Sequence, residues 1–155
     1  MAPEHRVVEA PARISFDAVR FRYPTRPDAP ALDDFTLDIA PGETVALVGP
    51  SGAGKSTVLS MLLRFHNVEA GAIRIDGLDL RQLDTAALRE QIALVPQAPT
   101  IFAASAAENI RYGRLEATDE QVRAAAVAAE ADGFLRELPE GYDSQLGERG
   151  ARLSG

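Results

Sequence analysis

Cysteine, long apolar runs and an excess of basic residues are all missing from this 155-residue sequence. The absence of cysteine excludes a disulfide framework and a cysteine-based zinc site. The apolar stretches at 45–48 and 58–63 are much shorter than the roughly 20 residues that a helix needs to cross a bilayer, so we expect no membrane span in this chain. The net charge of −7 argues against a nucleic-acid-binding protein, which needs a basic face to meet phosphates.

The residues that are present have the composition of one folded domain. Hydrophobic residues make up 46% of the chain and charged residues 25%, which is enough for a core and too apolar for a disordered chain. Residues 1–12 contain Pro3 and Pro11 and have no steady period, which is typical of a linker or arm. We therefore assign residues 1–12 to an arm and residues 13–155 to one domain.

Apolar residues predict strands in the first two thirds of the chain. Ile14, Phe16 and Val19 indicate a pair of strands running to Tyr23, and clean alternation at 35–39 marks a half-buried strand. The run at 44–48 is apolar on both faces, as expected for a central parallel strand covered by helices. Short strands are also predicted at 72–75, before the Asp76–Gly77 turn, and at 92–95.

Helices are predicted between and after these strands. One follows the glycine-rich turn over about 55–65, and a second covers about 85–91. Ser105 and Thr118 each precede a Glu or Gln at capping-box spacing, which predicts a helix through Ile110 and an alanine-rich helix to about Ala131. A further helical turn is expected around 134–138, before Pro139.

A phosphate-binding loop is the strongest chemical signal. The sequence GPSGAGKS at 49–56 matches G-x-x-x-x-G-K-[ST] and lies between an apolar strand and a helix. Glycines let consecutive backbone N–H groups point at phosphate oxygens, and the helix adds its own free amides and dipole. The lysine can reach the β- and γ-phosphates, and the serine hydroxyl can ligate Mg²⁺. The predicted nucleotide-binding residues are Gly49, Pro50, Ser51, Gly52, Ala53, Gly54, Lys55, Ser56 and Thr57.

Further segments, in order along the chain, resemble the nucleotide-binding domain of an ATP-binding cassette (ABC) transporter of the exporter type. Residues 21–24 (FRYP) resemble its A-loop, 94–97 (LVPQ) its Q-loop and 108–113 (ENIRYG) a segment common after the Q-loop. Residues 146–150 (LGERG) resemble its X-loop, and 153–155 (LSG) the opening of its LSGGQ signature. The resemblance implies an α/β fold: an incomplete P-loop NTPase core, an N-terminal antiparallel β subdomain and a helical segment after Gln97.

The same resemblance implies roles for individual residues. Tyr23 would stack on adenine, and Gln97 would approach Mg²⁺ and the attacking water as a catalytic residue beside Lys55. Ser154 and Gly155 would begin the signature that caps the nucleotide of a second nucleotide-binding domain. The family's Walker B aspartate, catalytic glutamate and switch histidine follow the signature, so we expect the chain alone to bind MgATP without hydrolysing it.

The resemblance also implies partners and a location. A transmembrane domain, in the same or a partner chain, would contact the segment from Gln97 to Ile110, with Ile101 and Phe102 as apolar anchors, and the segment from Glu148 to Gly150. The domain would act at the cytoplasmic face of the membrane, as part of a dimeric exporter.

Other interpretations remain open at this point. The chain could be a non-catalytic cassette fragment that binds nucleotide or a partner, or another P-loop enzyme such as a small-molecule kinase. Tyr23 could simply pack on Phe21, and Glu148 with Arg149 could be a solvated pair. We interpret His5 and His66 as surface residues without catalytic duty. Asp76 and Asp79 are interpreted as turn residues rather than a metal pair.

Overall fold

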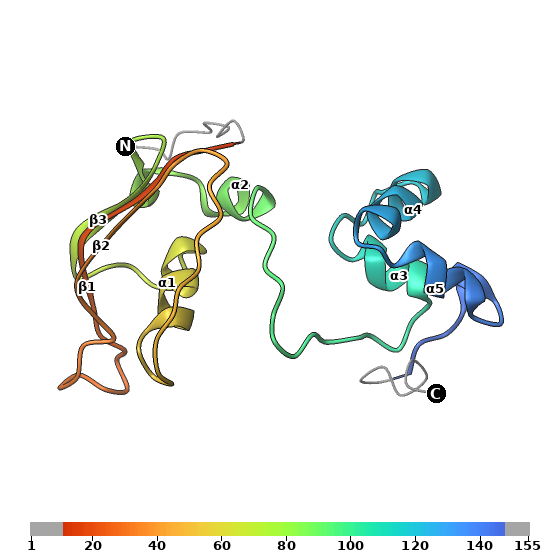
Figure 1. Cartoon of the computed structure of the whole chain (residues 1–155), viewed down its shortest axis with the longest axis horizontal. Coiled ribbons are helices and arrows are strands. Elements are labelled where there is room, and N and C mark those ends of the chain that lie inside the picture. The colour runs from red at the N-terminus through yellow and green to blue at the C-terminus, as the bar shows by residue number, and fades with distance from the viewer. Residues whose placement is uncertain (1–10, 148–155) are drawn as a thin grey trace. The chain divides into compact units, whose positions relative to one another are not determined.

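The computed structural model describes residues 11–147, which fall into two compact units that divide between Leu94 and Val95 (Figure 1). The first unit holds a β-sheet with helices, and the second is helical. The mixed α/β architecture confirms the predicted fold class. Each unit is described by itself below.

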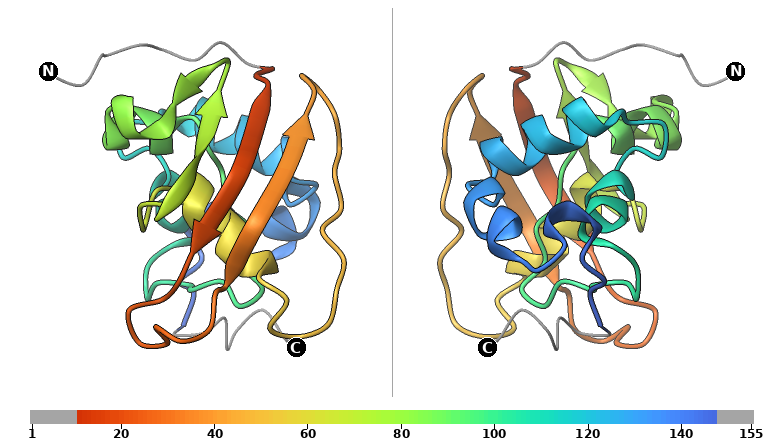
Figure 2. Two further views of the ribbon diagram at one scale, coloured as in Figure 1. Left: turned by 90° about the vertical axis from the view of Figure 1, so that its left-hand side faces the viewer. Right: turned by 90° about the vertical axis from the view of Figure 1, so that its right-hand side faces the viewer.

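A four-stranded antiparallel sheet forms the first unit, with strand order β2-β1-β3-β4 (Figure 2). Its strands are β1 (Ile14–Phe21), β2 (Leu32–Ile39), β3 (Ala70–Ile75) and the two-residue β4 (Leu78–Asp79). The prediction of a strand pair between Ile14 and Tyr23 was wrong, because these residues form one strand that pairs with β2 on one side and β3 on the other. The alternating burial of β2 confirms the half-buried strand predicted there.

Strand β1 is interrupted by a bulge that fixes its register. Ala18 has a φ of 43°, and the pairing with β2 and with β3 shifts in register at this point. Gly71 of β3 lies against the bulge with a φ of +79°, and a Cβ there would meet the Asp17 carbonyl oxygen at 2.3 Å. A glycine is therefore required at position 71 both for its conformation and for the approach of the two backbones.

One face of this sheet packs on helices α1 (Lys55–Leu62) and α2 (Thr85–Glu90) and on the 3-10 turn η1 (Leu80–Gln82). Phe16 and Val19 of β1 and Met61 of α1 are the most completely buried large side chains in the described residues. Helix α1 is shorter than predicted, since the chain leaves it at Leu63. The core thus fixes the helix that follows the glycine-rich loop against the sheet.

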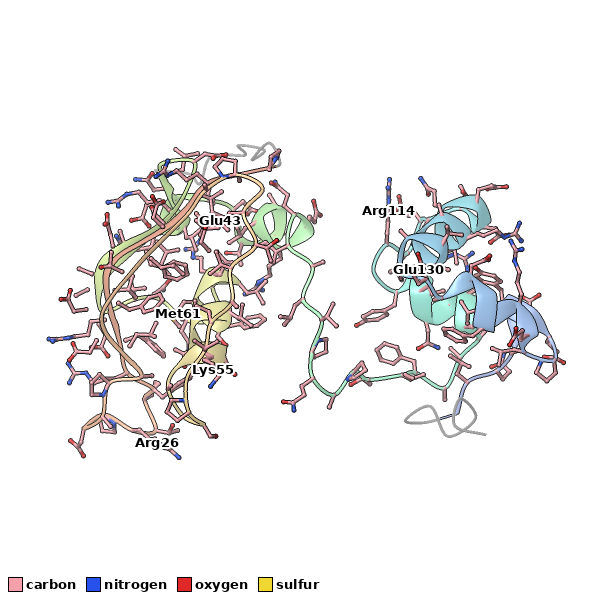
Figure 3. The ribbon with its side chains drawn as sticks, viewed as in Figure 1. Arg26, Glu43, Lys55, Met61, Arg114 and Glu130 are labelled. Carbon is pink, nitrogen blue, oxygen red and sulfur yellow. The ribbon has the colours of Figure 1, made fainter. Side chains whose placement is uncertain are left out.

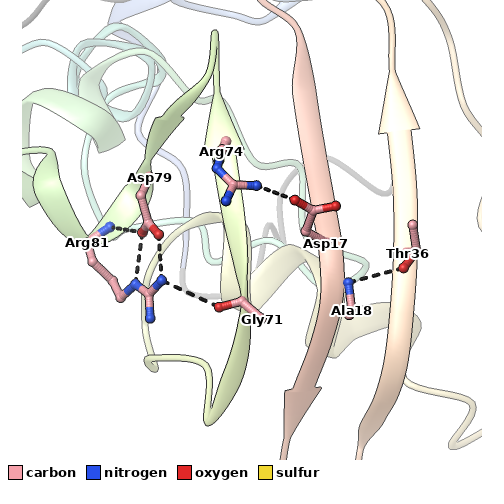
Figure 4. A network of polar contacts seen from close by, with 7 residues as sticks. All are labelled: Asp17, Ala18, Thr36, Gly71, Arg74, Asp79 and Arg81. Carbon is pink, nitrogen blue, oxygen red and sulfur yellow. Dashed lines mark hydrogen bonds and ion pairs between the residues drawn. The ribbon is translucent and has the colours of Figure 1, made fainter.

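Ion pairs cover the edge and outer side of the same sheet. Arg74 pairs with Asp17, and Arg81 pairs with Asp79, which also accepts a hydrogen bond from the Arg81 backbone N–H (Figure 4). Hydrogen bonds from Arg81 lower the pKa of Asp79. Within residues 11–147, no group of three or more acidic or histidine side chains is placed to hold a metal ion. Asp76 has a φ of 48° in the β3–β4 turn, as interpreted, whereas Asp79 ends β4 and caps the 3-10 turn η1.

The predicted strands at 44–48 and 92–95 are absent, and the chain is irregular at both. Val48 is 89% exposed and Val95 90% exposed, although Leu47 and Ile92 pack against the core of the first unit. A strand exists only where a neighbour completes its hydrogen-bond ladder. Among the described residues, neither segment pairs with another strand, so the apolar pattern alone did not decide the structure.

The second unit consists of α3 (Ala106–Arg111), α4 (Asp119–Ala128), α5 (Asp132–Glu137) and the turn η2 (Gly141–Asp143). Both predicted capping boxes are confirmed: Ser105 with Glu108 begins α3, and Thr118 with Gln121 begins α4. Its small core contains Ala106, Ala126, Leu135 and Leu146. In the part of the chain that the structure describes, no helix combines the length and apolar character that a membrane crossing needs.

Candidate functional site

The glycine-rich loop at 49–54 leads directly into helix α1. Gly52 and Gly54 have φ values of 83° and 88°, which side chains rarely adopt. A Cβ at Gly54 would meet the Ala31 carbonyl oxygen at 2.6 Å, so the loop passes closely under the residues that begin β2. The positive φ values and the close approach of Gly54 to Ala31 fix the conformation of the loop where it joins α1.

The N-terminus of α1 is left free for an anion. Gly54 occupies the N-cap position and supplies no side-chain cap, and no acidic residue lies in the first turn. The first amides of a helix have no partner within it, and the helix dipole favours negative charge there. This end of α1 therefore has the chemistry that a phosphate group needs, and phosphate binding there stays a prediction.

Lys55 begins α1 (Figure 3). Its ammonium donates hydrogen bonds to the carbonyl oxygens of Gly49 and Pro50 in the loop, at 2.7 and 2.8 Å. Its side chain is half-buried, and no carboxylate pairs with it among the described residues. The hydrogen-bond acceptors of the Lys55 ammonium are thus two neutral carbonyl groups of the loop. A phosphate oxygen would give it a stronger, charge-assisted partner.

The next two residues have different environments. Ser56 is exposed on the first turn of α1, which leaves its hydroxyl accessible to a cation. Thr57 is only 5% exposed, and its hydroxyl shares a hydrogen bond of 3.2 Å with the hydroxyl of Tyr23. The structure therefore brings Tyr23, predicted from the FRYP segment, onto the helix that carries the loop.

Tyr23 is half-buried among other rings. It makes an edge contact with Phe21 at a centroid distance of 5.0 Å, which is the packing offered as the alternative to adenine binding. It also contacts His66 at 5.5 Å. His66 itself is exposed, as interpreted from the sequence, but its contact with Tyr23 had no local signal and was not foreseen.

Gln97 belongs to the second unit, and the remaining predicted site residues lie outside the described residues. Gln97 is exposed in an irregular segment near the start of the second unit, and its role stays a prediction. Glu148, Arg149, Ser154 and Gly155, and also His5, lie outside the described residues.

The segment after Gln97 has a contact that sequence reasoning missed. The Asn109 side chain accepts a hydrogen bond from the Phe102 N–H at 2.8 Å and donates to the carbonyls of Phe102 and Ser105, both at 3.0 Å. Asn109 thus fixes the backbone before α3. Phe102 is held 41% exposed, with its ring 4.5 Å from that of Tyr112, whereas Ile101 packs against the core of the second unit.

The arrangement defines a class before any comparison: a P-loop nucleotide-binding protein. The family model described as "ABC transporter" matches residues 32–155. The chain is 52% identical over 143 residues to the mitochondrial potassium channel ATP-binding subunit of Xenopus tropicalis, covering 92% of this chain and 21% of that protein. It is 47% identical over 142 residues to ABC transporter B family member 3 of Dictyostelium discoideum, covering 92% of this chain and 10% of that protein.

A solved structure is also similar. A bacterial Atm1-family ABC exporter with ATP bound matches with a TM-score of 0.87 and 42% sequence identity, over 99% of this chain and 26% of that one. The chain therefore belongs to the ABC transporter family, as an ATP-binding domain of the exporter type. It spans about a fifth or less of the length of the two curated relatives described above. The family match gives no support to the small-molecule kinase interpretation.

Proposed function

We propose that this chain binds MgATP through the loop and helix start at 49–57. The observation that carries the proposal is the Lys55 ammonium, held by two loop carbonyls at the uncapped N-terminus of α1. That arrangement combines a cation, free amides and a helix dipole at one point, and all three favour a polyphosphate.

Specific residues would hold the parts of the ligand. Tyr23 would stack on adenine, Lys55 would bind the β- and γ-phosphates, and Ser56 with Gln97 would ligate Mg²⁺. The exposed Ser56 hydroxyl is an oxygen ligand of the kind that Mg²⁺ accepts together with substrate phosphates. The cation would neutralise charge on the phosphate oxygens.

In the parent protein we propose that two such domains bind ATP between them, with Ser154 and Gly155 of one beginning the signature that faces the nucleotide of the other. Hydrolysis would then drive export. A transmembrane domain would dock on the segment from Gln97 to Ile110, where Asn109 holds Phe102 beside Tyr112, and on the segment from Glu148 to Gly150. In this proposal the domain would act at the cytoplasmic face of a membrane.

The test is a titration of the chain with a fluorescent ATP analogue in the presence of Mg²⁺. Lys55→Ala removes the charged partner of the phosphates and should weaken binding by about tenfold or more, since charge-assisted hydrogen bonds contribute roughly 1.5–3 kcal/mol each. Arg81→Ala is the matched control, because it removes a surface cation of the same unit that is bound to Asp79. Equal affinities for wild type and Lys55→Ala would reject the proposal.

The same samples test turnover. The 155-residue chain should release phosphate at the background rate, because orienting the attacking water and holding Mg²⁺ need carboxylates that the family carries after the signature. Release above background that is abolished by Lys55→Ala would contradict this expectation.

A further inference from the structure

A three-ring cluster lies beside the P-loop helix in the first unit. Phe21, Tyr23 and His66 contact one another pairwise, with centroid distances of 5.0, 5.2 and 5.5 Å. Phe21 is buried in the sheet core, Tyr23 is half-buried and His66 is exposed. The cluster therefore runs from the core to the surface, with Tyr23 supported from two sides.

His66 is the member that completes the support of Tyr23. Its ring is tilted by 34° over Phe21 and stands at 86° to the ring of Tyr23, which is a favourable edge arrangement for aromatic rings. At its other end, Tyr23 is fixed by the hydroxyl contact with Thr57. A ring held at both ends loses less freedom on binding than a free one.

The turn that presents His66 is itself fixed. The Arg89 guanidinium donates to the Leu63 and Arg64 carbonyls at 3.0 and 3.2 Å, and Arg64 donates to the Leu83 carbonyl at 2.8 Å. Arg64 adopts a φ of 53°, which turns the chain out of α1 and toward the cluster. These bonds connect the turn to the residues around α2, so the position of His66 does not depend on its own contacts alone.

From this geometry we infer that His66 is a positioning residue for nucleotide binding, holding the Tyr23 ring ready to receive the adenine base. The inference rests on the proposed function, because Tyr23 acts on the base in that proposal. It predicts that His66 affects binding of the base and not of the phosphates, since the ring of His66 packs on Phe21 and Tyr23.

The test compares two competitors of the fluorescent nucleotide, MgATP and magnesium-bound inorganic triphosphate. The dissociation constant of triphosphate divided by that of ATP measures how much affinity the nucleoside part adds. His66→Ala should lower this ratio by about threefold to tenfold, the effect that one aromatic pair has, with triphosphate affinity unchanged. His66→Phe keeps a ring and should restore the ratio to within about twofold of wild type.

Three further variants make the result decisive. Phe65→Ala removes an exposed ring from the same turn, one that faces Arg89, and should leave the ratio unchanged. His66→Ala in a Tyr23→Ala background should have no further effect on the ratio, because the ring it positions is gone. If His66→Ala does not fold, as judged by circular dichroism, His66→Gln takes its place.

The outcomes separate this inference from the proposed function. Equal losses for ATP and triphosphate, or no loss for either, would overturn the role of His66. Triphosphate binding that is insensitive to Lys55→Ala would overturn the phosphate site itself, whatever His66 does.

Discussion

In the first unit, Ile14 pairs with Ile75 and with Ile39, so its sheet is built by residues far apart in the sequence. In the second unit, α3 and α4 each begin at a capping box whose two members are three residues apart. The sheet of the first unit depends on pairing between residues far apart in the sequence. The helices of the second unit begin at signals between residues close in the sequence. Sequence patterns should therefore be more reliable for the second unit than for the first, and this is what the structure shows.

The largest expected effect tests this difference with two glycines. Gly71→Ala places a Cβ 2.3 Å from the Asp17 carbonyl oxygen at a φ of +79°, and should destabilise the chain by about 2–4 kcal/mol. Gly133→Ala in α5 meets no atom within 4 Å and should change stability by less than about 1 kcal/mol, in the stabilising direction. Urea unfolding followed by circular dichroism measures both.

Similar effects of the two glycine substitutions would contradict the view that close backbone packing constrains position 71 in the sheet and not position 133 in α5. If Gly133→Ala lowered the free energy of unfolding more than Gly71→Ala does, the second unit would be the one that depends on close backbone packing.

A smaller effect concerns the cap of α3. Ser105→Ala removes a hydroxyl that accepts from the Glu108 N–H at 3.1 Å and should cost about 1 kcal/mol. Hydrogen bonds from the Ser105 backbone N–H and hydroxyl lower the pKa of Glu108. Because the folded-state pKa is the lower one, this contribution is complete above the unfolded value of about 4.3 and is lost as pH falls toward the folded value.

The pH dependence has a matched pair of variants. Glu108→Gln should flatten the stability curve below about pH 4.3, the ordinary pKa of glutamate, while keeping the capping box. Gln121→Glu should add to the dependence at α4, whose capping box is neutral in the wild type but where backbone and Thr118 hydrogen bonds already lower the pKa of Glu120. Thermal unfolding between pH 3 and 7 provides the readout, and an unaltered curve for Glu108→Gln would reject the assignment.

The smallest effect is expected on the outer side of the sheet. Arg74→Ala breaks the pair with Asp17, in which both side chains are at least one third exposed, and should cost no more than about 1 kcal/mol. A double-mutant cycle with Asp17→Ala isolates the coupling between the two residues. A coupling above about 2 kcal/mol would show that the surface ion pairs hold this sheet together, contrary to what exposed pairs usually contribute.

The candidate site also combines features that depend on neighbouring residues with contacts between residues far apart in the sequence. The glycine-rich loop could be predicted because its glycines, Lys55 and Ser56 lie within eight positions, and the following helix starts where the motif requires. The contact of Tyr23 with Thr57, and that of Tyr23 with His66, join residues more than thirty positions apart. Asn109 could be placed on a helix from the sequence, but its bonds to Phe102 depend on how the preceding loop returns to α3.

The sequence by itself determined the loop at 49–56, both capping boxes and the order of family segments, because each depends on residues within a few positions of one another. Only the tertiary structure decided whether the apolar runs at 44–48 and 92–95 are strands. The run at 70–75 pairs with β1, whereas the equally apolar run at 44–48 has no ladder among the described residues and stays irregular. The physical reason is that a helix satisfies its own backbone hydrogen bonds, while a strand depends on a neighbour that its own residues do not specify.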